Sequence, residues 1–302
     1  MTAKGMTVRK TPGKPTIAIV GAGSLATFLA EALDAAGFTI SEIVSRNSPQ
    51  SHRRARALAG KVGAQAITAS TAALDATLLW FCVPDREIRG VARTFADHLI
   101  ARVLVHQKEI AHFALHSSGA LLSRELEPLR KAGVAVASVH PLMTFVAGAK
   151  PSVSGVPFAI EGDAAATRVA RRIVRDLGGK SFSLQSSRKA AYHAWATLTS
   201  PLLLAFLVTL EEAARAAGLQ PKDARRMSLP IVRQTLANYS RLGSARSFSG
   251  PLIRGDAETV AKHLKVLKKH PGVREVYVAL ARAALRGLPV KNRVELARLL
   301  RG

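Results

Sequence analysis

Short continuous apolar runs alternate with longer segments of mixed polarity from Pro15 to Gln185. An apolar run of this length, bounded by turn residues, is typical of a strand that is buried on both faces of a parallel sheet. The segments between the runs have the composition of helices, among them residues 51–60, 86–99, 164–177 and a helix that ends at Lys131. Residues 101–108 show no pattern that assigns them to a helix or a strand. This alternation predicts an α/β domain. The strands are expected at residues 17–20, 40–45, 65–68, 76–83, 110–115, 134–139, 157–161 and 180–184.

The pattern changes after Gln185, where helical periodicity continues almost to the end of the chain. Glycine and proline interrupt it at residues 218–221, 243–255 and 271–272 and near Pro289, and Pro201 is expected to kink the first helix. We therefore predict three parts: a disordered basic tail at 1–14, an α/β domain at 15–186 and an all-helical domain at 187–302.

The segment from Gly21 to Ala26 has the pattern G-x-G-x-x-A and lies between the first strand and a helix that stops at Gly37. This order is the one that a dinucleotide-binding turn requires. Gly21 permits the tight turn, and a side chain at Gly23 would meet a pyrophosphate. The N–H groups at the helix start, from Ser24 and Leu25, would face the phosphates.

The tip of the second strand indicates which dinucleotide binds. NAD sites carry an acidic residue there, which holds the ribose hydroxyls. This strand instead ends in Ser45, Arg46 and Asn47, with Arg53 and Arg54 just beyond. Because guanidinium groups pair with phosphate through two donors, the tip predicts NADP(H), although an ordinary polar loop would have the same composition.

Three later strands also end in polar or proline-bearing tips, where ligands bind in open α/β sheets. The first tip contains Val83, Pro84 and Asp85, which we expect beside the cofactor; Asp85 also suits a helix cap. The second contains His116 and Ser118, and the third contains His140. Both histidines are candidates to flank the nicotinamide or to bind a substrate carboxylate, and Ser118 is a candidate hydrogen-bond donor. Each of the three is also a common structural residue.

Composition narrows the function classes. The chain has 302 residues and a formal net charge of +24, which favours anionic ligands and permits weak nucleic-acid binding. Its basic residues are spread along the chain, so we expect no specific nucleic-acid site. The one cysteine, Cys82, suits a reducing cytoplasm. We expect no metal site, no secretory signal and no membrane span.

Several segments in order resemble a bacterial family that joins a Rossmann-like NADP-binding domain to a helical domain of unknown function. That family is related to pyrroline-5-carboxylate reductase, deazaflavin-dependent NADP oxidoreductases and β-hydroxyacid dehydrogenases. The resemblance implies an NADP cofactor, a homodimer and a C-terminal domain like that of 6-phosphogluconate dehydrogenase. It rests on residues 21–26, 83–85, 116–119, 138–142, 158–163, 189–193 and 250–256.

Lys189 and His193 lie four residues apart and therefore share a helix face. In the related β-hydroxyacid dehydrogenases a lysine on the corresponding helix faces the nicotinamide. We expect Lys189 to donate a proton to a developing alkoxide or amine and His193 to orient substrate or lysine, although a solvated lysine and a packed histidine would give the same pattern. The predicted function is an NADP(H)-dependent oxidoreductase with a small polar substrate in the interdomain cleft. A non-catalytic NADP(H)-binding sensor or regulatory dimer is the alternative.

Overall fold

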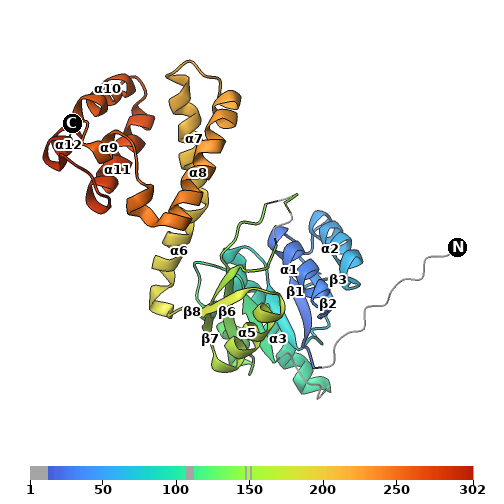
Figure 1. Cartoon of the computed structure of the whole chain (residues 1–302). Helices are drawn as coiled ribbons and strands as arrows, with labels where there is room; N and C mark the ends of the chain where they lie inside the picture. Colours follow the sequence, from blue (N-terminus) through green and yellow to red (C-terminus); the bar gives the residue numbers. More distant parts are fainter. Residues whose placement is uncertain (1–12, 107–111, 147, 150–151, 302) are drawn as a thin grey trace. The chain divides into compact units, whose positions relative to one another are not determined.

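The computed structural model describes residues 13–106, 112–146, 148–149 and 152–301 (Figure 1). The chain divides into two compact units, residues 1–196 and 197–302, and each is described by itself. The first unit includes the α/β domain and continues past the expected boundary at 186, to residue 196.

The first unit is built on one eight-stranded sheet with the order β3-β2-β1-β4-β5-β6-β7-β8. All neighbouring strands are parallel except β6 and β7, which are antiparallel. The predicted α/β fold is confirmed, and each predicted strand is present, β3 with the predicted bounds and the others with shifted ones. The strands are β1 (Thr16–Val20), β2 (Thr39–Ser45), β3 (Gln65–Thr68), β4 (Leu78–Phe81), β5 (Phe113–His116), β6 (Ala135–Pro141), β7 (Pro157–Gly162) and β8 (Lys180–Ser183).

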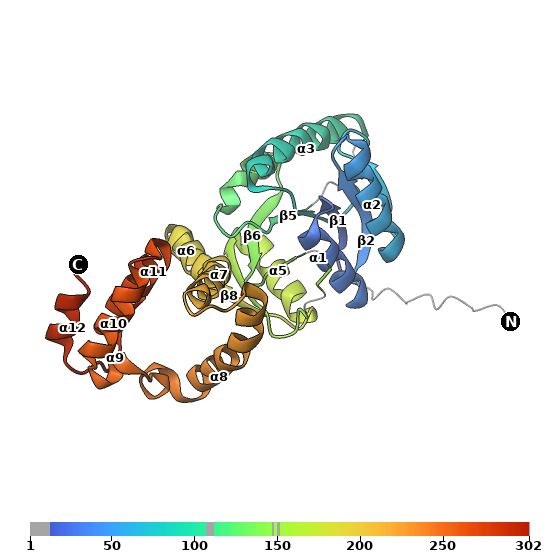
Figure 2. The same ribbon diagram turned by 90° about the horizontal axis from the view of Figure 1, so that it is seen from above.

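Helices cover both faces of this sheet (Figure 2). One face carries α1 (Ser24–Ala35), α2 (Pro49–Val62) and α5 (Ala164–Asp176), and the other carries α3 (Asp85–His106), η1 (Ser123–Leu126) and α4 (Glu127–Lys131). Alternate residues of β1 enter the two cores: Ile17 and Ile19 pack with α1, whereas Ala18 and Val20 pack with α3. A continuous apolar strand is therefore required here, since neither face meets water.

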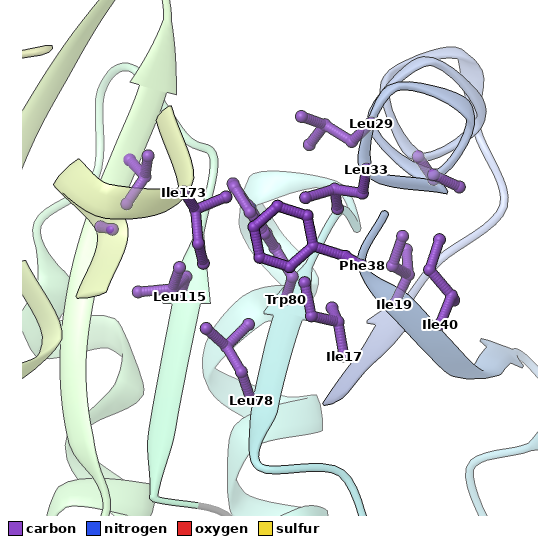
Figure 3. Packing of buried hydrophobic residues seen from close by; sticks show 14 of the residues in the cluster. Ile17, Ile19, Leu29, Leu33, Phe38, Ile40, Leu78, Trp80, Leu115 and Ile173 are labelled. Carbon is purple, nitrogen blue, oxygen red and sulfur yellow. The ribbon is translucent and has the colours of Figure 1, made fainter. Parts of the chain in front are cut away.

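Figure 3 shows the first of these cores, where Phe38 and Trp80 fill the space between the sheet and the helices above it. Both rings are almost fully buried. Leu29 and Leu33 contact them from α1, and Ile173 approaches from α5. This packing fixes α1 against β1 and so sets the direction of the helix start that follows the glycine turn.

Three local expectations differ from the structure. Helix α3 extends to His106 and so covers most of the stretch that favoured no structure; residues 107–111 lie outside the described part of the chain, with the predicted start of β5. The helix expected to end at Lys131 is split into η1 and α4, because Pro128 begins a new first turn. Lys14, assigned to the disordered tail, is ordered: its Nζ donates to the Ala36 carbonyl at 2.6 Å.

The first unit ends on α6 (Lys189–Thr199), which follows a short η2 turn (Ser186–Arg188). Helix α6 stops at Ser200, whose φ of −132° and ψ of −75° are not helical, and Pro201 opens the next helix. The predicted kink is thus a complete break, since proline cannot donate to the preceding turn.

The second unit is all-helical, as predicted. Its compact core contains residues such as Val260, Leu264, Val278 and Leu296. The remaining interruptions fall where glycine and proline predicted them, including the non-helical Gly243 with φ of 76° inside α8. The helices are α7 (Pro201–Arg215), α8 (Pro221–Ser247), α9 (Pro251–Arg254), α10 (Ala257–Leu267), α11 (Pro271–Gly287) and α12 (Arg293–Leu299).

Large apolar side chains are exposed along α7 and α8, among them Leu204 at 62% and Ile231 at 68%. Within the described residues one helical stretch, Ser186–Arg215, also has the length and composition of a membrane span. That stretch includes the break at Ser200.

Candidate functional site

The turn between β1 and α1 contains two glycines with different roles. Gly21 has a φ of +118°, and a Cβ on it would lie 2.5 Å from the carbonyl oxygen of Cys82, which directly follows β4. Any larger residue is therefore excluded by the protein itself. Gly23 adopts an extended conformation, and a Cβ there would meet no protein atom within 4 Å. Its missing side chain leaves space that a ligand can enter.

Helix α1 begins directly behind this space. Its first intrahelical bond runs from the Thr27 N–H to the Gly23 carbonyl at 2.9 Å. The N–H groups of Ser24 and Leu25 precede that bond and point out of the helix end. Together with the helix dipole they form an anion-binding end, which agrees with a phosphate at this turn.

A cavity of about 250 Å³ opens beside the turn, between the ends of β1, β2 and β4 and the start of α2. Six of the expected cofactor residues line it: Gly21, Gly23, Ser45, Arg46, Val83 and Pro84. Four others, Ser24, Leu25, Asn47 and Asp85, are not among its lining residues. Ser24 lines a second hollow of about 700 Å³ along the outer side of α1 instead.

The basic side of the cavity comes from two arginines. Arg46 is 66% exposed, and its Nη1 lies 3.3 Å from Glu87 Oε1. An ion pair so exposed is weak, so the guanidinium can exchange Glu87 for a ligand anion. Arg54, Ser48 and Ser51 line the same wall from α2. The sequence indicated Arg54 only as a neighbour, because a helix of unknown phase did not show which arginine faced inward.

His116, at the end of β5, is fully buried and bonded through both ring nitrogens. Nε2 lies 3.0 Å from the Leu122 carbonyl, and Nδ1 accepts the Ser118 N–H at 3.2 Å. These partners require a neutral ring that is protonated on Nε2. Burial, with a smaller effect of the Lys189 charge, lowers the pKa of His116 from 6.5 to about 4. A substrate carboxylate would find neither a charge nor a free nitrogen here.

Ser118 joins the loop after β5 to the start of α3. Its hydroxyl donates to Asp85 Oδ2 at 2.8 Å and accepts the N–H groups of Ala120 and Leu121. The hydroxyl proton is therefore held by Asp85 and is not directed at a ligand. Asp85 serves here as an acceptor that fixes this loop.

Lys189, the first residue of α6, is a lysine with only 2% of its side chain exposed. Its Nζ donates to Ser138 Oγ on β6 and lies 3.7 Å from Glu161 Oε1 on β7. Burial lowers the pKa of Lys189 to about 8, although the Glu161 carboxylate opposes this effect. The lysine is thus protonated at pH 7 and loses its proton within the range of ordinary enzyme assays.

His140 and Tyr192 form a second pair beside Lys189. The Tyr192 hydroxyl lies 2.7 Å from His140 Nδ1, and burial raises the pKa of Tyr192 to about 12. Burial and the nearby Lys189 charge lower the pKa of His140 to about 4. Both groups are therefore neutral near pH 7. Sequence reasoning missed Tyr192, although its position three residues after Lys189 places it on the same side of α6.

His193 and Gly119 complete this cluster. The rings of His140 and His193 have centroids 6.4 Å apart. A Cβ on Gly119 would lie 2.7 Å from His193 and 2.8 Å from His140 Nε2, so the loop passes closely over both rings. The structure therefore brings Lys189, His140, His193 and Ser118 together with Glu161, Ser138 and Tyr192, all within the first unit. The described residues contain no group of three or more His, Cys, Asp and Glu side chains with metal-binding geometry.

Comparisons with protein families agree with this architecture. Residues 2–141 match a Rossmann-like domain, and residues 156–284 match a domain of unknown function, DUF2520. The chain is therefore a Rossmann-like domain followed by a DUF2520 domain, which confirms the resemblance seen in the sequence. A search among curated proteins finds no match.

Solved structures share the fold over nearly the whole chain. A candidate NADP oxidoreductase from Bacteroides fragilis is 23% identical with a TM-score of 0.70, and the match covers 89% of this chain and 97% of that one. A protein from Thermotoga maritima is 24% identical with a TM-score of 0.68, covering 95% and 100%. A pyrroline-5-carboxylate reductase from Coxiella burnetii is 16% identical with a TM-score of 0.57, covering 94% and 99%.

The two histidines of the site provide a direct test of its electrostatics. In NMR titrations we expect the Cε1–H signals of His116 and His140 to move near pH 4, with His140→Asn identifying one of them. Since the unfolded chain binds these protons at about pH 6.5 and the folded chain does not, stability should fall as pH drops from about 6.5 to 4. Midpoints near 6.5 for both signals would contradict the described burial.

Proposed function

We propose that this protein is an NADP(H)-dependent oxidoreductase that transfers a hydride to or from a small polar substrate. The observation that carries the proposal is a buried lysine with a pKa of about 8, held by Ser138 of β6 and Glu161 of β7, in the same unit as a dinucleotide-binding turn. The shared fold of a pyrroline-5-carboxylate reductase and a candidate NADP oxidoreductase supports it.

The residues around the glycine turn fit the cofactor. The start of α1 would hold the pyrophosphate against the open space at Gly23. Arg46 and Arg54, with the hydroxyls of Ser45, Ser48 and Ser51, would hold the 2′-phosphate of the ribose. The residues at the tip of β2 include no carboxylate to favour the free hydroxyls of NAD, and the nearby Glu87 carboxylate comes from α3 and pairs with Arg46. NADP(H) supplies the hydride when bound.

Lys189 is the proposed proton donor. An ammonium with a pKa of about 8 is charged at pH 7 and close enough to neutrality to release its proton. Reduction of a carbonyl or an imine places a hydride on carbon and requires a proton on oxygen or nitrogen, and Lys189 would provide it. We propose that His193 and the neutral His140–Tyr192 pair orient the substrate. His116 and Ser118, whose polar atoms are engaged within the protein, would position the loop after β5.

The alternative function is that of an NADP(H)-binding sensor without turnover. The deep burial of Lys189 favours it, since an ammonium held by Ser138 and Glu161 also acts as a structural ion pair. NADPH binding without oxidation across a panel of carbonyl and imine substrates would support this function.

We also propose that the protein is a homodimer in the cytoplasm. Soluble proteins rarely leave large contiguous apolar patches exposed to water. A second copy of the chain would cover the exposed apolar residues of α7 and α8. With a single cysteine, Cys82, the chain has no internal disulfide, which suits a reducing compartment.

The first test of this proposal concerns the cofactor. Wild-type protein should bind NADPH with micromolar affinity and more tightly than NADH, measured by calorimetry. Arg46→Asp and Arg54→Asp should each weaken NADPH binding roughly 10-fold to 100-fold and leave NADH affinity nearly unchanged, because only NADPH carries the 2′-phosphate. Arg53→Asp is the matched control: it makes the same charge change on α2 outside the cavity wall. Equal losses in all three variants would rule out a defined phosphate site.

The second test concerns the proton donor. Lys189→Met should lower the rate of NADPH oxidation about 10²- to 10⁴-fold while NADPH affinity stays within about twofold. In the wild type the rate should fall as pH rises through about 8, where Lys189 loses its proton. Lys180→Met, on the exposed strand β8, removes an equal charge from the same unit and should retain activity. Full activity in Lys189→Met would exclude the lysine as donor.

The third test concerns assembly. Light scattering should give twice the mass of one chain for the wild type, and Leu204→Glu with Ile231→Glu should give a monomer, because a charge would have to be buried in the interface. Val294→Glu changes an apolar residue of α12 that is 77% exposed and should remain dimeric. A monomeric wild type at micromolar concentration would refute the dimer.

A further inference from the structure

Glu161 is a buried carboxylate that has no assigned role in the proposed hydride and proton transfer. It lies near the end of β7, and 6% of the residue is exposed. One oxygen accepts the Ser123 N–H at 2.6 Å, and the other accepts the hydroxyls of Ser123 at 2.9 Å and Ser186 at 3.2 Å. These donors come from η1 and η2, so two elements outside β7 fix the position of the carboxylate.

The same carboxylate lies beside the lysine. Glu161 Oε1 is 3.7 Å from Lys189 Nζ, which also donates to Ser138 Oγ. The Ser138 hydroxyl donates in turn to the Ser118 carbonyl at 3.3 Å, so its oxygen lone pairs are free to accept from the ammonium. Lys189 Nζ is thereby held between β6 and β7 by one charged and one neutral acceptor.

We infer that Glu161 is a positioning residue for Lys189: its carboxylate holds the ammonium against Ser138 and keeps the lysine protonated inside the protein. This inference rests on the proposed function, in which Lys189 is the proton donor. A buried ammonium without a counter-charge would lose its proton near neutral pH. With Glu161 in place, Lys189 carries a proton to the reaction. Without Glu161, the lysine would already have released that proton.

The other charged and titratable groups around Lys189 do not replace Glu161. Asp85, at the start of α3, acts on Lys189 from farther away and already accepts the Ser118 hydroxyl. His116 on β5 and His140 on β6 are neutral near pH 7, since burial lowers the pKa of each to about 4. Tyr192 is neutral because burial raises its pKa, and His193 lies beyond His140. Glu161 is the carboxylate that forms an ion pair with Lys189 among the described residues.

The test is a direct titration of Lys189 in the full-length protein. With ¹³C-labelled lysine, the Cε signal of Lys189 is identified by its loss in Lys189→Arg and followed with pH by NMR. In Glu161→Gln we expect the midpoint of Lys189 to fall about one to three pH units below that of the wild type. Glu125→Gln is the control, because it removes an η1 carboxylate that pairs with Arg89 away from Lys189. In Glu125→Gln the midpoint of the Lys189 titration should stay at the wild-type value.

Circular dichroism and thermal unfolding verify that each variant is folded. Should Glu161→Gln not fold, Glu161→Asp supplies the measurement: it keeps the charge but withdraws it by one methylene group, and the midpoint should fall by less. An unchanged Lys189 midpoint in either folded variant would overturn the inference. A midpoint that falls equally in Glu125→Gln would also overturn it, since the effect would then be one of net charge.

The kinetic measurement separates this inference from the proposed function. In Glu161→Gln the high-pH limb of NADPH oxidation should move to lower pH together with the NMR midpoint, while NADPH affinity stays within about twofold. A purely structural Glu161 would change thermal stability without moving either midpoint. If the wild type shows no turnover, the proposed function fails, and the NMR titration still decides whether Glu161 controls the protonation of Lys189.

Discussion

Burial of the Lys189 ammonium is the constraint on which the rest of the site depends. A charge out of water is tolerated only when it is paired and fully hydrogen-bonded, so Ser138, Glu161 and the donors to Glu161 must be in place together. These groups come from β6, β7, η1, η2 and α6. The pairing therefore ties the first turn of α6 to the sheet, which explains why the first compact unit continues to residue 196.

The sequence predicted the framework well because the framework depends on local chemistry. Strand β1 is apolar on both faces, and Gly21 has a conformation that only glycine adopts without strain. Pro201 and Gly243 mark helix breaks for equally local reasons. The positions of the strand tips followed from the parallel order of the sheet, so Arg46, His116 and His140 could be nominated before any coordinates. Lys189 could be nominated from its spacing to His193 and from the family resemblance.

The roles of those residues could not be predicted, since they depend on contacts between distant segments. In the sequence, Lys189 begins a helix, and this position suggests a solvated side chain. Its burial depends on Glu161, which belongs to a strand much earlier in the chain. The partner of His140 is Tyr192, which the sequence marks only as an aromatic residue on a helix. His116 seemed equivalent to His140, yet both of its ring nitrogens bond to backbone groups of its own loop. His116 is fully buried whereas His140 is partly exposed, and this difference in burial separates the environments of the two histidines.

The two histidines and the lysine form one electrostatic system. Each histidine is neutral partly because Lys189 is charged, and the lysine keeps its charge because Glu161 is fixed nearby. A single buried cation can donate a proton without competition from neighbouring acids. Two charged histidines beside Lys189 would lower the pKa of the lysine further, and the lysine would then be deprotonated. The same arrangement leaves Lys189 as the positive charge beside His116 and His140. A substrate that binds there would gain most by placing the atom that becomes negative, the oxygen or nitrogen of the reduced bond, toward that one ammonium.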